Sequence, residues 1–79
     1  MTDPYVPIAC GVHDQYERAL ITGTPLVAHW TIGGRPHHGR IWVLEIETRR
    51  SEEFVVFRDI NDMHHRVRLD HIRLQAAPS

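Results

Sequence analysis

The spacing of apolar residues changes after Pro25, and this change constrains the fold more than any other feature. Over residues 26–32, apolar residues recur at every second position, as in a strand with one buried face. Gly33 and Gly34 follow, and both accept the positive φ that a tight hairpin turn requires. The sequence therefore predicts a strand over 26–32 that turns back at the two glycines.

Four more runs have the composition of strands, and they cover residues 40–47, 53–60, 65–69 and 72–74. The first is apolar on both faces in its middle, which indicates a central strand that a helix covers on one side. The second ends before Asn61-Asp62, a common pair in turns. In the third, Arg66 and Arg68 share one face of the strand, while Val67 and Leu69 share the other.

A helix is predicted before these strands, over residues 14–22. Asp14 fits the N-cap and Glu17 follows three residues later, which is a capping-box spacing with Asp in the place of Ser or Thr. Gly23 stands where a helix commonly ends, shortly before a proline. The residues expected to face inward, at spacings of three and four, are Tyr16, Ala19 and Leu20.

The chain of 79 residues is long enough for one domain, which we expect to span residues 1–79. We predict a mainly β fold with one N-terminal α-helix and five short antiparallel strands. Such a sheet curls to bury its apolar face, so the expected architecture is a strongly bent small barrel with the helix across one opening. Sm-like and OB-like barrels both fit this pattern.

Composition indicates a cytoplasmic protein. No run approaches the roughly 18 apolar residues of a membrane span, and the first residues lack the basic region and apolar stretch of a secretory signal. The single Cys, Cys10, cannot form an internal disulfide. The strands are short and rich in Arg and His, which blunts a sheet edge and favours a monomer.

The His and Cys residues offer little evidence for chemistry. In the adjacent pairs His37-His38 and His64-His65, neighbouring side chains in a strand point to opposite faces, so each pair offers at most one ligand on a face. We therefore expect solvated His beside turns, with no metal and no other cofactor. Cys10 is expected to be a small buried apolar plug under the helix rather than a reactive thiol. No residue order indicates a catalytic triad, and we expect no enzyme activity.

An alternative hypothesis is direct RNA binding through Arg58, Arg66 and Arg68. All nine basic residues are Arg, whose planar group pairs with phosphate or carboxylate. An RNA-binding sheet needs exposed aromatic residues between such side chains. The aromatic residues near these Arg positions are Trp30, Trp42, Phe54 and Phe57, and most of them are expected to point inward. A solvated face of Arg and acid pairs is therefore favoured over an RNA site.

Acidic residues dominate the front of the chain. Residues 1–17 hold three acids and no Arg, whereas residues 18–79 hold nine Arg and seven acids. Helix N-termini attract carboxylates, so capping by itself explains Asp14 and Glu17. A carboxylate has lone pairs beyond the one that the backbone uses, so capping and contact with a partner can coexist.

Two motifs near the ends of the chain carry a family resemblance. They are Tyr5-x-Pro7-Ile8-x-Cys10 followed by Asp14, Glu17 and Ala19, and Arg68-Leu69-Asp70-x-Ile72. At these spacings, with one helix before five strands, the chain resembles the Rho-binding antiterminator family Rof, also called YaeO. Gly11 and Val12 stand where a member of that family is acidic.

The resemblance implies a small Sm-like barrel that binds the transcription termination factor Rho. It implies that the protein blocks the primary RNA-binding site in the N-terminal OB-fold domain of Rho, so that RNA cannot load. Asp14 and Glu17 are then the expected contacts with Rho, and Asp3 and Gln15 accompany them. The residues expected to set the geometry of the first segment are Tyr5, Pro7 and Cys10. An Sm-like RNA-binding module and an adaptor barrel for another protein remain as alternatives.

Overall fold

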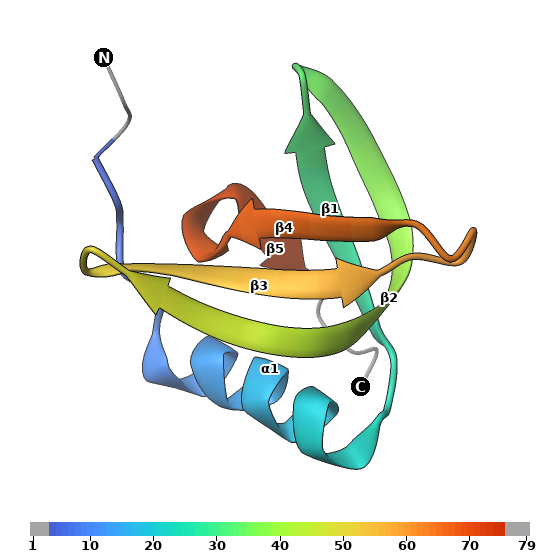
Figure 1. Ribbon diagram of the computed structural model, residues 1–79, viewed down its shortest axis with the longest axis horizontal. Coiled ribbons are helices and arrows are strands. Elements are labelled where there is room, and N and C mark those ends of the chain that lie inside the picture. The colour runs from blue at the N-terminus through green and yellow to red at the C-terminus, as the bar shows by residue number, and fades with distance from the viewer. Residues whose placement is uncertain (1–3, 76–79) are drawn as a thin grey trace.

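The computed structural model describes residues 4–75 (Figure 1). Its elements are α1 (Cys10–Thr22), β1 (Leu26–Ile32), β2 (Arg35–Arg49), β3 (Glu52–Arg58), β4 (His64–Arg68), the 3-10 turn η1 (Leu69–His71) and β5 (Ile72–Leu74). The five strands form one antiparallel sheet in the order β4-β3-β2-β1-β5. This confirms the predicted fold class, which is mainly β with one N-terminal helix.

The long central strand β2 bends the sheet. Its first half pairs with β1 and its second half pairs with β3. The register shifts between Val43 and Glu45, so Leu44 is an extra residue that bends the strand and increases its twist. Figure 1 shows the resulting curve of β2 beneath β3 and β4. Within residues 4–75 the end strands β4 and β5 do not pair, so the expected barrel is an open, strongly bent sheet.

Helix α1 lies along β2 and covers one side of the bent sheet (Figure 1). Tyr16 and Ala19 are buried, as predicted, whereas Leu20 is 38% exposed and that part of the prediction is wrong. The stripe that meets the sheet consists of the half-buried Val12 with Tyr16 and Ala19, at i, i+4 and i+7, and Leu20 lies at the exposed edge of this stripe. The core residues are Tyr16, Ala19, Ala28, Trp30, Ile41, Val43, Val55, Phe57, Val67, Leu69 and Ile72.

Helix α1 begins at Cys10, four residues before the predicted start at residue 14. Ala9 is the N-cap, with extended φ and ψ of −63° and 146°, and its carbonyl accepts the amides of Val12 and His13. Asp14 therefore lies inside the helix and does not cap it. Packing explains the difference, because Ile8 and Val12 both contact the core, and tertiary contacts decide where a short helix starts.

The predicted helix end is confirmed at Gly23. This residue has φ 71°, and its amide donates to the carbonyl of Ala19 at 2.9 Å. The hairpin at Gly33 and Gly34 is confirmed as well, with φ of 56° and 79°. In each case a glycine takes a left-handed conformation that other residues adopt only with strain.

Candidate functional site

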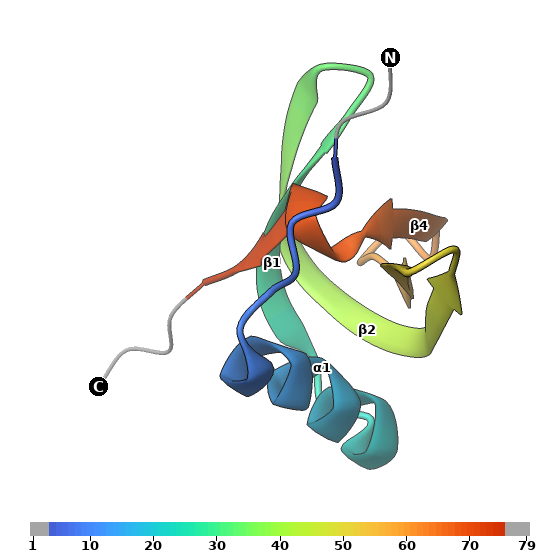
Figure 2. The same cartoon turned by 90° about the vertical axis from the view of Figure 1, so that its left-hand side faces the viewer.

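The two sequence motifs meet in space although they lie at opposite ends of the chain. The amide of Val6 donates to Oδ2 of Asp70 at 3.0 Å, across a separation of 64 residues. Arg68 Nη2 donates to the carbonyl of Pro4 at 3.5 Å, and its guanidinium carbon lies 5.7 Å from the centre of the Tyr5 ring. Figure 2 shows this first segment running past η1 before it enters α1. The closing motif therefore holds the opening motif in position.

Arg68 is the centre of this contact. Its side chain is only 7% exposed, and it donates twice to Asp70, from Nε to Oδ1 at 2.6 Å and from Nη2 to Oδ2 at 2.9 Å. Its Nη1 donates to Glu52 Oε1 at 2.9 Å. The expectation of a solvated face is wrong for Arg68, which is buried because it pairs with two acids.

Charge and hydrogen bonding in this contact favour the ionised state of Asp70. Burial by itself raises the pKa of Asp70, but the hydrogen bonds from Arg68 and the Val6 amide outweigh it and lower this pKa. The hydrogen bonds to Asp70 also raise the pKa of Arg68. The segment before α1 is thus attached to a carboxylate whose ionised state this contact favours.

A groove opens beside this attachment, between the first segment, the start of α1 and the turn from β2 to β3. Its volume is about 510 Å³, which falls within the range of about 300–1,000 Å³ found for ligand sites. The lining residues are Tyr5, Pro7, Ile8, Cys10, His13, Asp14, Thr48, Ser51 and Glu53. We call this feature the acidic groove, and it gathers most of the opening motif.

Three of the four residues expected to contact a partner lie along α1 and are exposed. They are Asp14, Gln15 and Glu17. The fourth, Asp3, lies outside the described residues. Because Ala9 rather than Asp14 is the N-cap, the Asp14 carboxylate is not used by the first amides of the helix. Both carboxylates are accessible on the same helical surface, since residues three apart are neighbours there.

Sequence reasoning missed two residues of this site, His13 and Glu53. The Nδ1 atom of His13 lies 3.1 Å from Oε1 of Glu17, and its Nε2 atom lies 3.1 Å from Oε2 of Glu53 on β3. A helix that starts at Asp14 leaves His13 outside, so the i,i+4 spacing of His13 and Glu17 carried no meaning in that interpretation. The contact with Glu53 needs the tertiary structure.

Cys10 is exposed at the first position of α1 and lines the acidic groove. The expectation of a buried plug is wrong. The physical reason is that α1 already starts at Cys10, so this residue is the first of the helix and does not lie beneath it. The apolar contacts with the core are made by Ile8 and Val12 instead. Tyr5 and Pro7, the other residues expected to set the geometry of this segment, line the same groove.

Two of the Arg residues in the RNA hypothesis lie on aromatic rings of the outer sheet face. The guanidinium of Arg58 lies 4.5 Å from the centre of the Trp42 ring, and that of Arg66 lies 4.0 Å from the centre of the Phe54 ring. Trp42 and Phe54 are therefore half-buried beneath Arg side chains instead of pointing inward. Strand alternation explains this, since both rings share a face with the Arg residues.

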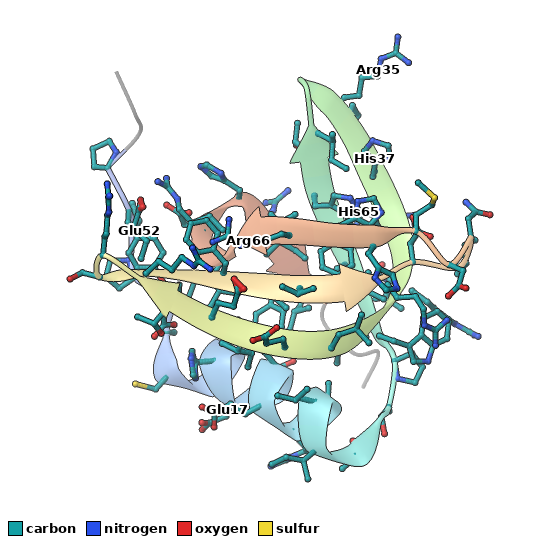
Figure 3. All side chains as sticks on the ribbon, in the orientation of Figure 1. Glu17, Arg35, His37, Glu52, His65 and Arg66 are labelled. Atoms are coloured by element: carbon teal, nitrogen blue, oxygen red, sulfur yellow. The ribbon has the colours of Figure 1, made fainter. Side chains whose placement is uncertain are left out.

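The expected pairs between Arg and acids are present on this face. Arg66 Nε donates to Glu47 Oε1 at 2.9 Å, and Arg58 Nε lies 3.6 Å from Asp62 Oδ1. Figure 3 shows Arg66 on the sheet and Glu17 on the helix below it, so these two side chains lie on different parts of the molecule.

The paired histidines differ in their surroundings. His37, His38 and His64 are exposed, as expected. His65 is half-buried, and its Nε2 lies 2.8 Å from Asp59 Oδ2, so the expectation of a solvated side chain is wrong for this residue. Its ring also stacks on Phe57, with centres 5.1 Å apart. The hydrogen bond to His65 is the largest contribution that lowers the pKa of Asp59.

The fold and the site define a small β protein with one covering helix and an acidic groove at the start of that helix. Comparisons with protein-family models, with curated proteins and with solved structures find no match for this chain. No helix within residues 4–75 is both long enough and apolar enough to cross a membrane.

Proposed function

We propose that this protein inhibits Rho-dependent transcription termination in the bacterial cytoplasm. It binds the N-terminal OB-fold domain of Rho at the primary RNA-binding site and keeps RNA from loading. The proposal rests on the resemblance of the two end motifs to the Rho-binding antiterminator family. One structural observation supports it most: Asp70 and Arg68 of the closing motif hold the segment that contains Tyr5 beside the exposed acids of α1.

The mechanism is competition for a positive surface. A protein that binds single-stranded RNA uses a cationic groove with aromatic residues on which bases stack. Carboxylates held at fixed positions can occupy the same positive field in place of phosphates. Asp14 and Glu17 act as the contacts, with Gln15 and Asp3 as neighbours, while Tyr5, Pro7 and Cys10 shape the segment. The protein acts as a monomer and without catalysis.

A displacement assay tests this proposal. Purified protein is added to Rho bound to labelled cytidine-rich RNA, and the release of RNA is measured at several salt concentrations. We expect release that weakens as salt rises, because charges at an exposed interface are screened. We expect the double variant Asp14→Lys with Glu17→Lys to keep the fold, measured by circular dichroism, and to lose the release of RNA. Unchanged release by this variant would overturn the assigned site.

A matched control separates the site from net charge. Glu45→Lys reverses an exposed acid on β2, outside the acidic groove, and is compared with Asp14→Lys alone. We expect Asp14→Lys to weaken RNA release and Glu45→Lys to leave it close to wild type. Equal losses in the two variants would contradict a specific contact on α1.

The RNA-binding alternative has its own support in Arg58 and Arg66, which lie over aromatic rings on the outer face. The same assay distinguishes it, because a protein of that kind shifts the labelled RNA in the absence of Rho. If the protein neither releases RNA from Rho nor binds RNA by itself, the adaptor alternative remains.

A further inference from the structure

Because α1 starts at Cys10, it brings together three side chains of the kinds that coordinate metal ions. With the helix running from Cys10, residues His13, Asp14 and Glu17 follow at i, i+1 and i+4 within two turns. One donor atom from each of these three side chains lies within 4.8 Å of the other two. Residues four apart on a helix are neighbours, so the backbone brings His13 and Glu17 together without a loop.

One spacing in this cluster, between His13 and Glu17, is close to that of a coordination sphere, and the other spacings are within 4.8 Å. Zinc binds His nitrogen and carboxylate oxygen at about 2.0–2.2 Å, so neighbouring ligand atoms of a tetrahedral zinc lie about 3.3 Å apart. His13 Nδ1 and Glu17 Oε1 are 3.1 Å apart. The carboxylate of Asp14 is exposed and turns about single bonds, so it can close the remaining distance without moving the backbone.

A residue from another element orients the imidazole. Glu53 of β3 lies 3.1 Å from the Nε2 atom of His13, on the side of the ring opposite the Glu17 contact. Histidines that bind metals commonly donate their second ring N–H to a carboxylate, which fixes the tautomer and the ring orientation. Here this contact occupies Nε2 and leaves Nδ1 facing Glu17. Glu53 is thus a positioning residue, since it acts through His13.

We propose that His13, Asp14 and Glu17 bind a divalent transition-metal ion of the zinc class, with the fourth position open to solvent. One imidazole and two carboxylates match the ligands that zinc accepts. Magnesium and calcium prefer shells made of oxygen alone, so the nitrogen of His13 favours zinc over them. The ion offsets the repulsion among the carboxylates of Asp14, Glu17 and Glu53 around one ring.

The site also bears on the proposed function. A bound cation neutralises the carboxylates of Asp14 and Glu17, so we expect zinc to weaken the release of RNA from Rho. This consequence rests on the proposed function, whereas metal binding does not. Titration with zinc measures metal binding without Rho. A failure of the metal site can therefore be told apart from a failure of the proposed inhibition of Rho.

Zinc titration of the whole chain tests the site, by calorimetry and by competition with a chromophoric chelator. We expect one equivalent of zinc bound by the wild type, and no competition from magnesium in excess. The variants His13→Gln and Glu17→Gln should each weaken binding at least tenfold while their circular dichroism stays unchanged. Glu53→Ala should weaken it by about tenfold, the lower end of the range for residues that orient a ligand.

Two controls address other possible zinc ligands. Cys10→Ser removes the exposed thiol near the groove, and the double variant His29→Gln with His38→Gln removes two imidazoles stacked 4.4 Å apart on β1 and β2. Both should bind zinc like the wild type. The proposal would be overturned if either control lost the bound equivalent of zinc. It would also be overturned if the wild type bound no zinc, or if the folded His13→Gln variant bound zinc as fully as the wild type.

Discussion

The carboxylate of Asp70 meets the guanidinium of Arg68 edge to edge, through contacts of 2.6 and 2.9 Å. Both side chains are less than 10% exposed, and Asp70 also accepts the amide of Val6. Planar pairing of this kind fixes geometry as well as energy. The pair therefore links β4 and η1 to the segment that borders the acidic groove.

Replacement of Asp70 should destabilise the protein strongly. In Asp70→Asn the side chain loses its charge and one of its two acceptor oxygens, so Arg68 loses this charged partner and a single oxygen remains for Arg68 and the Val6 amide. We expect the free energy of unfolding to fall by about 2–3 kcal/mol, measured by urea denaturation. Asp62→Asn is the matched control, since Asp62 is 80% exposed, and it should change stability by less than about 0.5 kcal/mol. Similar losses in both variants would contradict a structural role of the pair.

The same carboxylate should make stability depend on acid pH. Hydrogen bonds from Arg68 and Val6 lower the pKa of Asp70 in the folded protein, below the value of about 3.9 for an unfolded chain. The contribution is then fully present above that unfolded value and is lost as the pH falls through the lower folded pKa. Urea denaturation should be measured from above the unfolded pKa to below it. The difference in free energy of unfolding between wild type and Asp70→Asn should become smaller as the pH falls. A difference that stays constant would contradict the assignment.

The turn between β2 and β3 should be open to stabilisation. Arg50 and Ser51 make a two-residue hairpin with φ of 51° and 66°, although neither is glycine. Left-handed conformations are costly for residues with a Cβ. We expect Ser51→Gly to raise the free energy of unfolding by about 0.5–1 kcal/mol. Ser51→Ala keeps the Cβ and should give no gain, so an equal gain from both variants would exclude relief of strain.

The start of α1 should accept a better cap. Ala9 has the extended conformation of an N-cap residue but no side-chain oxygen for the free amides. Ala9→Asp should therefore raise the free energy of unfolding by about 1 kcal/mol, measured by thermal or urea denaturation. Asp14→Ala should change stability by less than about 0.5 kcal/mol, because Asp14 is exposed inside the helix. If Asp14→Ala costs as much as the loss of a cap, the helix starts where the sequence pattern predicts.

Local sequence patterns predict much of the fold. Alternation over 26–32, the glycine turn at 33–34 and Gly23 each depend on preferences of neighbouring residues, and the structure confirms all three. The length of β2 was not predicted. The strand runs over Arg35–Arg49, whereas the prediction covers only 40–47 and omits residues 35–39 and 48–49, which pair with β1 and β3. A polar residue in an exposed strand position adds nothing to the apolar periodicity. The ends of β2 are therefore set by its pairing with β1 and β3.

The sequence by itself determined the class of this protein, a bent sheet of five strands with one helix in front, because side-chain periodicity follows from backbone geometry. Only the tertiary structure decided that α1 starts at Cys10, that Arg68 is buried against Asp70, and that Glu53 reaches His13. Each of these features depends on contacts between residues distant in the chain. Burial of a charge and the choice of a helix start are settled by such contacts, which a local pattern does not contain.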